Sequence, residues 1–241
     1  NYVKNYNTKF IKKGKYLIRL ENISIKGHES KLLFKELNIF IPSGSIVSIN
    51  SSPRKGKTKL FKTMALLERP LEGSVHLLGK NINKLSRAEI ASIHSEIGIV
   101  YQKNHFVHDF DLEYNIIYPL ILKGEKIIDI KLALKELLPW LHLESLMKNS
   151  VYQSSYIELK LAQFARAIIS RPRILLLDNF FSDLEENMEK KINYLILALN
   201  KIGTSIIIFG PLPKGDTIKF NKQYKIHEKG LIEIGRKPLN L

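Results

Sequence analysis

The 241-residue chain contains no cysteine, which excludes disulfide bonds and zinc sites built from thiolates. It also lacks an apolar run that approaches the ~20 residues of a membrane-spanning helix. The longest candidate, Ile116 to Leu122, is interrupted by Tyr118 and Pro119. Acidic residues are scarce beside basic ones, with 23 Asp and Glu against 38 Lys and Arg. What remains is an ordinary globular composition, 44% hydrophobic and 25% charged, in a chain able to bury a sizeable core.

The formal net charge of +15 suggests two classes of partner, nucleic acid and an anionic membrane surface. The excess is mainly lysine and accompanies abundant isoleucine and asparagine, as an AT-biased coding sequence produces. Nucleic-acid binding is therefore not favoured. Residues 1–16 are interpreted as a basic N-terminal extension, in which residues 9–15 would suit a membrane surface, and residues 17–241 as a single domain.

Strands and helices are expected to alternate along most of the chain, which predicts an α/β fold with a mostly parallel sheet. Residues 17–25 alternate in polarity like a half-exposed strand. Residues from about 103 to 170 are mainly helical and are expected to form an inserted subdomain. The other expected strands are 32–41, 45–50, 74–78, 97–101, 174–178, 204–209 and a hairpin over 223–234 that turns at Lys229-Gly230. The expected helices include one from the Gly56-Lys57-Thr58 segment to about Leu67, 86–95, 130–143 and 186–202.

A carboxylate follows the most apolar of these strands. Four apolar residues, 174–177, precede Asp178 and are typical of a strand buried on both faces. The acid is then expected at the carboxyl edge of the sheet, where it would suit a Mg²⁺ ion that carries nucleotide phosphates. The next residue, where a phosphate-hydrolysing enzyme of this design needs a base, is Asn179. Asp178 therefore predicts a nucleotide site, whereas Asn179 argues against nucleotide hydrolysis at that site.

Gly56-Lys57-Thr58 lies where a predicted strand turns into a predicted helix, which is the context of a phosphate loop. Backbone N–H groups at such a helix start attract phosphate oxygens, lysine reaches the β- and γ-phosphates, and the threonine hydroxyl helps to hold Mg²⁺. The full pattern G-x-x-x-x-G-K-[ST] is not met, because Ser51 stands at its first glycine. The motif is weak alone and gains its meaning from the Asp178 strand.

Several further segments keep the order and spacing of one known family. They are Ser51 to Leu60, Glu68 to Gly73, Ile97 to Gln102, Asp111 to Leu120, Ala165 to Asp178, Ser182 to Glu185 and His227 to Gly230. Over roughly residues 17–235 the chain resembles the ATP-binding subunits of ABC transporters, in the branch that serves lipoprotein release, cell division and macrolide export. The resemblance implies a P-loop NTPase fold with an antiparallel β subdomain and a helical subdomain, and it implies ATP and Mg²⁺ as ligands.

The resemblance also assigns residues to the nucleotide. They are Ser51, Arg54, Lys55, Gly56, Lys57, Thr58, Gln102 and Asp178, of which Thr58, Gln102 and Asp178 would lie around Mg²⁺. Ser51 and Arg54 both replace glycines of the family loop, and a side chain is strained where the backbone adopts positive φ. Arg54 and Lys55 add positive charge beside the phosphates. No aromatic residue stands near Lys26-Gly27 for adenine stacking, where His28 is the available substitute.

The segment that matches the family signature L-S-G-G-E is altered. It reads Ser154-Ser155-Tyr156-Ile157-Glu158, so Tyr156 and Ile157 replace the two glycines that allow close approach to a partner's γ-phosphate. Ser155 and Glu158 retain the spacing of a helix capping box. The structural role of the segment is expected to persist without the catalytic one.

No catalytic residue of the family is intact. Asn179 replaces the catalytic glutamate, and an amide cannot accept a proton from water, which removes a factor of roughly 10²–10⁴. Gly210 replaces the switch histidine and leaves no side chain to contact the γ-phosphate. In a homodimer or beside an intact partner, each shared site would lack part of its machinery. Whether the chain is an enzyme stays open, with hydrolysis predicted to be absent or very slow.

The resemblance implies two protein partners. A membrane permease would dock near Gln102 and Tyr114 to Leu122, and a second ATP-binding subunit, identical or different, would complete a dimer. The chain would then lie peripherally at the cytoplasmic face of the cell membrane. The alternative is a scaffold or regulatory subunit that no longer binds nucleotide and acts through contacts with the permease alone.

Overall fold

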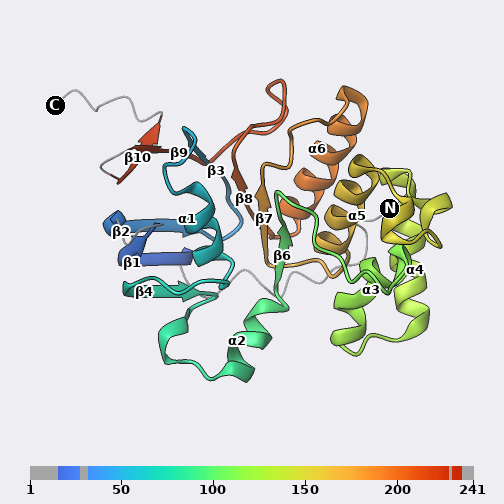
Figure 1. Ribbon diagram of the computed structural model, residues 1–241, viewed down its shortest axis with the longest axis horizontal. Coiled ribbons are helices and arrows are strands. Elements are labelled where there is room, and N and C mark those ends of the chain that lie inside the picture. The colour runs from blue at the N-terminus through green and yellow to red at the C-terminus, as the bar shows by residue number, and fades with distance from the viewer. Residues whose placement is uncertain (1–15, 28–31, 228–229, 235–241) are drawn as a thin grey trace.

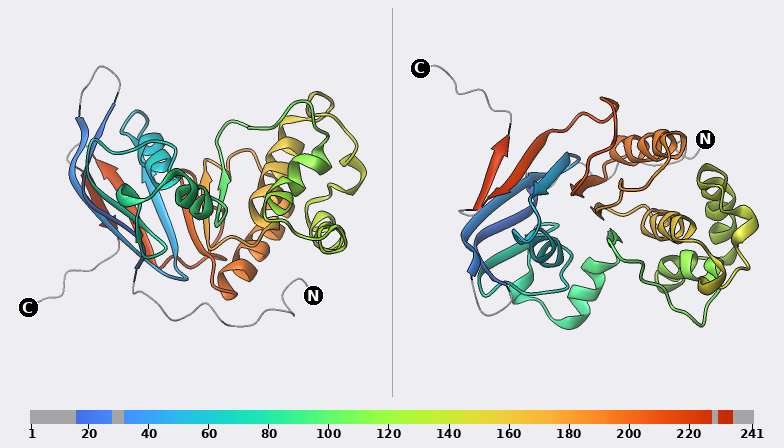
Figure 2. Two further views of the ribbon diagram at one scale, coloured as in Figure 1. Left: turned by 90° about the horizontal axis from the view of Figure 1, so that it is seen from below. Right: turned by 45° about the horizontal axis from the view of Figure 1, so that its top comes forward.

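The computed structural model describes residues 16–27, 32–227 and 230–234. Most of the expected N-terminal extension, His28 and Lys229 lie outside these residues. Figures 1 and 2 show a part rich in strands at one end of the molecule and a group of helices at the other. The strands that carry the candidate site lie between them.

The elements follow the expected order. The strands are β1 (Tyr16–Lys26), β2 (Leu32–Pro42), β3 (Ile46–Ser51), β4 (Glu72–Leu77), β5 (Lys80–Asn81), β6 (Ile97–Val100), β7 (Ile174–Asp178), β8 (Ser205–Phe209), β9 (Lys222–His227) and β10 (Gly230–Ile234). The α-helices are α1 (Lys57–Met64), α2 (Arg87–His94), α3 (Leu112–Leu122), α4 (Ile127–Leu141), α5 (Tyr156–Ile169) and α6 (Glu186–Lys201). Short 3₁₀ helices cover Ile82–Lys84, Glu144–Leu146 and Val151–Gln153.

Helix α1 is shorter than expected. It ends at Met64 rather than near Leu67, because Leu66 adopts a left-handed backbone with φ of 59°. The N–H groups of Leu66 and Leu67 then donate back to the carbonyl oxygens of Thr63 and Lys62 at 3.2 and 2.9 Å. This closure satisfies carbonyl groups that the last turn leaves unpaired.

Two sheets form the framework. The larger has the strand order β10-β9-β3-β8-β7-β6, in which β9 through β6 pair in parallel and β10 pairs antiparallel with β9. The smaller is antiparallel with the order β2-β1-β4-β5. Every residue of β7 and β8 is buried, as the apolar run before Asp178 predicts. The architecture is the α/β P-loop NTPase fold with an added antiparallel sheet.

The expectation of a half-exposed first strand is wrong. In β1 only Asn22 and Lys26 are exposed. The strand pairs with β2 on one side and β4 on the other, and its pairing with β2 shifts between Leu20 and Ile23. Asn22, with φ of 50°, lies at this irregularity. Because the shift changes which side chains face inward, residues 23–25 are all buried and the simple alternation is lost.

Hydrophobic cores cover both faces of the larger sheet. Alternate residues of β7 point into the two cores. Leu175 and Leu177 pack in the core that includes α3 to α6, whereas Ile174 and Leu176 pack in the core that includes α1 and the antiparallel sheet. Phe164 of α5 stacks on Phe180, just after β7, with ring centroids 4.8 Å apart. Packing on both faces fixes the position of the carboxyl edge of the sheet.

Among the residues that the structure describes, no helix has both the length and the apolar character needed to span a membrane.

Candidate nucleotide-binding site

The carboxyl ends of β3, β8, β7 and β6 lie in this order along one edge of the larger sheet. Two backbone hydrogen bonds extend the ladder beyond the strands. The N–H of Gly210 donates to Ile49 O at 3.1 Å, and the N–H of Asn179 donates to Phe209 O at 2.8 Å. The positions that match the family's catalytic glutamate and switch histidine are therefore held close together. In open parallel sheets this edge is where ligands bind.

In the loop between β3 and α1, the glycine of the Gly56-Lys57-Thr58 motif lies where the loop enters the helix. Gly56 caps α1 with φ of 94°, and its carbonyl accepts the N–H of Leu60 at 3.0 Å. A Cβ atom at this position would lie 2.8 Å from Cε2 of Phe34. Glycine is thus required both by the left-handed backbone and by the aromatic ring behind it. The free N–H groups at the start of α1 provide a positive helix end for an anion.

The two glycine replacements in this loop differ in their structural effect. Arg54 adopts a left-handed backbone with φ of 62° and has an exposed side chain. Ser51 is the last residue of β3 and pairs with Ile226 of β9, without positive φ. The expected strain is therefore present at Arg54 and absent at Ser51.

Lys57, the first residue of α1, extends to the end of β7. Its Nζ atom lies 3.2 Å from Oδ1 of Asp178 and donates a hydrogen bond to Oδ1 of Asn179. The side chain of Lys57 is 14% exposed and that of Asp178 only 3%. Thr58, the next residue of the helix, is exposed. The structure brings Lys57, Asp178 and Asn179 together.

Asp178 is a buried carboxylate with few partners. Burial raises its pKa, and the nearby Lys57 ammonium opposes this rise. Its Oδ1 atom lies 3.2 Å from the Lys57 ammonium and has no other partner among the residues that the structure describes. A buried oxygen of this kind is suited to a divalent cation, because hard cations prefer carboxylate and hydroxyl oxygens.

Gly210 lies against the side chains of Asn179 and Lys57, which occupy the space that a side chain at position 210 would need. It is buried, its φ is 99°, and a Cβ atom there would lie 2.0 Å from Oδ1 of Asn179 and 2.9 Å from Nζ of Lys57. Asn179 itself has φ of 50°, a conformation that asparagine adopts more readily than most residues. In this arrangement position 210 has no room for a side chain.

Gln102 lies in the loop after β6 and is exposed. Sequence reasoning missed the residue that fixes the start of this loop, Gln163 of α5, which is completely buried. Its Oε1 atom accepts the N–H of Tyr101 at 2.6 Å, and its Nε2 atom donates to Oδ1 of Asn104 at 3.0 Å. The available signal was an amide within the apolar run of α5. Gln163 connects the helical part to the strand that leads to Gln102.

We expect Gln163→Met to lower the free energy of unfolding by about 1–2 kcal/mol, because methionine fills a similar volume and leaves the Tyr101 N–H without its acceptor. Amide hydrogen exchange in residues 101–105 should become faster. Asn104→Ala, which removes one partner and leaves the Tyr101 bond, should have the smaller effect in urea unfolding. Equal losses in the two variants would contradict this assignment.

The segment that matches the family signature begins α5. The predicted capping box is present, since the Ser155 N–H donates to Oε2 of Glu158 at 2.7 Å and the Glu158 N–H donates to Oγ of Ser155 at 3.3 Å. Tyr156 is half exposed and Ile157 is partly buried. The segment lies in the helical part of the molecule, whereas the phosphate loop precedes α1 in the strand-rich part (Figure 1).

A second residue of α5 was also missed. Lys160 is 3% exposed, and burial lowers its pKa. Its Nζ atom donates to the carbonyl oxygen of Ser182 and lies 3.7 Å from Oδ2 of Asp183. The Ser182 hydroxyl in turn donates to the carbonyl oxygen of Asn179 at 2.7 Å. A short chain of polar contacts therefore joins the signature helix to the end of β7.

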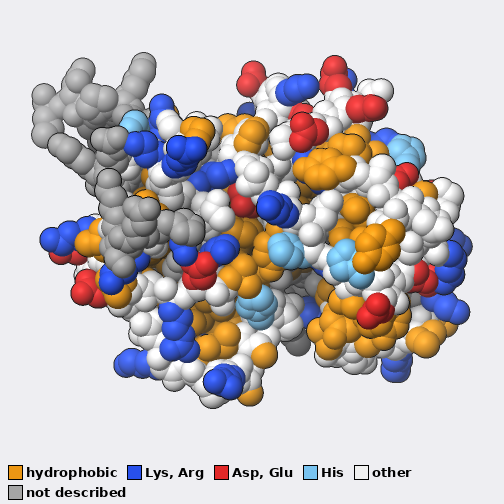
Figure 3. Space-filling model, viewed as in Figure 1, with side chains coloured by type: hydrophobic (Ala, Val, Ile, Leu, Met, Phe, Trp, Pro, Cys, Tyr) orange, Lys and Arg blue, Asp and Glu red, His pale blue; other side chains and the backbone are white. Residues whose placement is uncertain are grey.

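Aromatic side chains gather on the surface of the helical part. The ring of Phe110 lies 4.3 Å from that of Tyr114, which lies 6.3 Å from that of Tyr118, between centroids. Tyr114 and Tyr118 are about two-fifths exposed, and Leu122 is more so. Figure 3 shows hydrophobic side chains concentrated over this part of the molecule. The exposed face of α3 is suited to contact with another protein.

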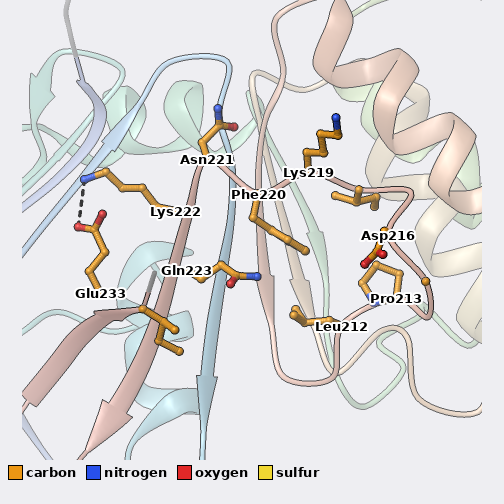
Figure 4. Close-up of a pocket in the computed structure, with 12 residues that line it drawn as sticks. Leu212, Pro213, Asp216, Lys219, Phe220, Asn221, Lys222, Gln223 and Glu233 are labelled. Atoms are coloured by element: carbon orange, nitrogen blue, oxygen red, sulfur yellow. Dashed lines mark ion pairs between the residues drawn. The ribbon is translucent and has the colours of Figure 1, made fainter. Parts of the chain in front are cut away.

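A separate hollow of about 770 Å³ lies beside β9 and β10. Phe220 and Leu212 contribute apolar surface, and Lys222 pairs with Glu233 at 3.7 Å (Figure 4). None of the residues that the motifs assign to nucleotide lines it. The hollow therefore does not replace the carboxyl edge of the sheet as the candidate site.

Comparison with known proteins gives the family. The family model described as "ABC transporter" matches residues 34–182, more than half of the chain. The lipoprotein-releasing system ATP-binding protein LolD of Colwellia psychrerythraea is 29% identical over 192 residues, which cover 79% of this chain and 74% of that protein. The cell division ATP-binding protein FtsE of Escherichia coli is 25% identical over 192 residues, 80% of this chain and 86% of that protein.

A solved structure agrees in fold. The dimeric ATP-binding cassette MJ0796, in a post-hydrolysis state bound to ADP and Pi, superposes with a TM-score of 0.81 at 23% identity. The match covers 90% of this chain and 97% of that one. The matched family model, the relatives and the sheet edge described above agree with one another. The chain belongs to the ABC transporter family, in the branch of the lipoprotein-release and cell-division ATP-binding subunits.

Proposed function

We propose that this chain is the ATP-binding subunit of an ABC-type membrane transporter or membrane complex, and that it binds ATP while hydrolysing it very slowly or not at all. The observation that carries the proposal is the edge of the sheet where Lys57 and Asp178 are in contact and Asn179 stands at the position of the base. The binding residues are retained there, and the proton acceptor is not.

The retained residues have distinct roles toward nucleotide. The N–H groups at the start of α1 and the ammonium of Lys57 would bind phosphate oxygens, with Arg54 and Lys55 adding positive charge. Thr58, Gln102 and the buried carboxylate of Asp178 would hold Mg²⁺, and the buried Oδ1 of Asp178, whose one contact among the described residues is with the Lys57 ammonium, supports this fit. The ion supplies charge neutralisation on the phosphates when it is bound.

Slow hydrolysis follows from the chemistry of two positions. The Asn179 amide can hydrogen-bond a water molecule but cannot accept its proton, which costs roughly 10²–10⁴-fold in rate. Gly210 has no side chain to contact a γ-phosphate. Neither neighbouring residue can replace this base, because Lys57 is a cation and Asp178 is assigned to the metal. Binding without efficient turnover is the expected result.

The proposed partners are a permease and a second ATP-binding subunit. The surface near Gln102 and Tyr114 to Leu122 would receive the permease, and the exposed rings on α3 support this use. The dimeric state of MJ0796 supports pairing with another subunit. The name of LolD, part of a lipoprotein-releasing system, supports a position at the cytoplasmic face of the membrane, held there by the permease.

One observation favours the alternative of a scaffold without nucleotide. Arg54 has a left-handed backbone in the phosphate loop, and the lysine of that loop is engaged by Asp178 and Asn179. A protein that keeps its fold for protein contacts alone would tolerate both features. The two functions differ in a single measurable property, the affinity for Mg-ATP.

Titration calorimetry of the purified chain with ATP and Mg²⁺ separates them. We expect saturable binding that Lys57→Ala weakens at least tenfold, since a charged hydrogen-bonding group at the phosphates is lost. Phosphate release by the wild-type chain should not exceed that of the Lys57→Ala variant. The absence of heat at millimolar ATP would instead assign the scaffold function, and rapid turnover would refute the predicted loss of hydrolysis.

A further inference from the structure

The side chain of Lys57 must cross the edge of the sheet to reach Asp178 and Asn179, so it needs open space there. Lys57 follows β3, and its contacts Asp178 and Asn179 follow β7, while β8 lies between these two strands. The lysine side chain therefore passes the end of β8, where Gly210 stands. A Cβ atom at position 210 would lie 2.9 Å from the lysine Nζ and 2.0 Å from the Asn179 Oδ1.

We propose that Asn179 is a positioning residue that holds the Lys57 ammonium at the end of β7 in the nucleotide-free protein, and that Gly210 makes room for this contact. We call the arrangement of Lys57, Asn179 and Gly210 the lysine latch. It rests on the proposed function, because it regulates the same nucleotide site, and it gives a role to two positions otherwise described as losses.

The latch competes with nucleotide for one ammonium group. Lysine has three N–H donors, and in the latch they face a carboxylate and an amide oxygen at the end of β7. Binding of the β- and γ-phosphates requires the ammonium to leave the amide oxygen. A contact made only in the free state lowers the apparent affinity for the ligand by the fraction of molecules in which it is formed.

The geometry explains why the two positions act as a pair. Asn179 carries its acceptor in the left-handed conformation with φ of 50°, and its N–H is fixed by Phe209 O, one residue before Gly210. The backbone thereby points the amide oxygen at the space that a side chain on residue 210 would occupy. Any side chain at position 210 must displace Asn179, so the latch exists only with glycine there.

The test uses Asn179→Gly, which removes the acceptor and is compatible with the left-handed backbone. In the nucleotide-free protein, acylation of Lys57 by an amine-reactive reagent, mapped by mass spectrometry, should become several-fold faster. Lys59 and Lys62, which pair with Glu68 at 2.8 Å, are the internal references and should not change. In calorimetry, Mg-ATP should bind about five- to tenfold more tightly to the variant.

Gly210→Ala provides an independent variant, because its Cβ displaces Asn179. It should also tighten Mg-ATP binding in the wild-type background and have no such effect when Asn179→Gly is already present. Gly203→Ala is the control for backbone strain, since Gly203 has φ of 107° and open space around its Cβ position. If Gly210→Ala does not fold, the acylation and calorimetry measurements on Asn179→Gly are sufficient to test the latch.

The outcomes separate the latch from the proposed function. If neither the wild type nor Asn179→Gly binds Mg-ATP, the proposed function fails, and unchanged Lys57 acylation then overturns the latch as well. If the wild type binds and Asn179→Gly binds no more tightly, the latch is overturned while the proposed function stands. Binding by Asn179→Gly where the wild type shows none would support the latch directly.

Discussion

Gly98→Ala is expected to lower the free energy of unfolding by about 3 kcal/mol, the largest effect of a single methyl group that we predict here. Gly98 lies in β6, beside α5, and a Cβ atom at this position would lie 2.2 Å from the carbonyl oxygen of Ala167 and 2.9 Å from Cγ of Pro172. The first contact is with helix backbone, which cannot turn aside like a side chain. The strand and helix must separate, in a core packed as densely as a crystal.

Urea unfolding at neutral pH checks this value, and Gly27→Ala is its matched control. The Cβ atom of alanine at position 27 would lie 2.9 Å from Cγ of Leu33, a partly exposed side chain that can change rotamer. Neither glycine has positive φ, so backbone strain does not enter the comparison. We expect the control to lose less than about 1 kcal/mol. Similar losses at both positions would show that β6 and α5 are not in the close contact described.

Asp178→Asn is expected to stabilise the fold at neutral pH and to abolish the proposed Mg²⁺ site. Burial raises the pKa of Asp178 above its ordinary value of 3.8, and Lys57 offsets this only in part. The folded protein therefore binds a proton more tightly than the unfolded chain. It follows that this carboxylate lowers stability as pH rises through its pKa in the folded state. Asparagine has the same shape and no charge to bury.

The pH dependence gives the sharper measurement. The difference in unfolding free energy between Asp178→Asn and the wild type should be largest near neutral pH. It should shrink as pH falls through the raised pKa, and it should vanish below the ordinary pKa of aspartate. Asp216→Asn, at an exposed loop position, should change the free energy of unfolding little at neutral pH. A variant less stable than the wild type at neutral pH would mean that the ion pair with Lys57 outweighs the burial of the carboxylate.

The parts of the molecule that sequence predicted well are those set by local chemistry. The apolar run before Asp178 is a strand buried on both faces, and the S-x-x-E spacing at Ser155 is a capping box. The end of α1 and the burial of β1 were predicted less well. In both cases a single left-handed residue, Leu66 or Asn22, alters the local pattern. Leucine rarely adopts this conformation, and asparagine adopts it too seldom for the sequence alone to predict it at position 22.

The parts that sequence could not predict depend on contacts between distant segments. Gln163 lies 62 positions after Tyr101, and Lys57 lies 122 positions before Asn179. Motif comparison marks Gly210 as a missing histidine, but only the folded sheet shows that the same position borders the Asn179 amide oxygen. The role of a residue at the sheet edge depends on the residues of adjacent strands that it contacts. The residues next to it in the sequence do not reveal which contacts these are.

The close fit between Gly210 and Asn179 has a consequence for how such a chain can evolve. In this conformation a Cβ atom at position 210 would overlap the Asn179 amide oxygen and would be strained by the positive φ, so a side chain there requires the Asn179 side chain to move. The side chains at positions 179 and 210 are therefore expected to change together in evolution, whereas the residues that make protein contacts can change independently.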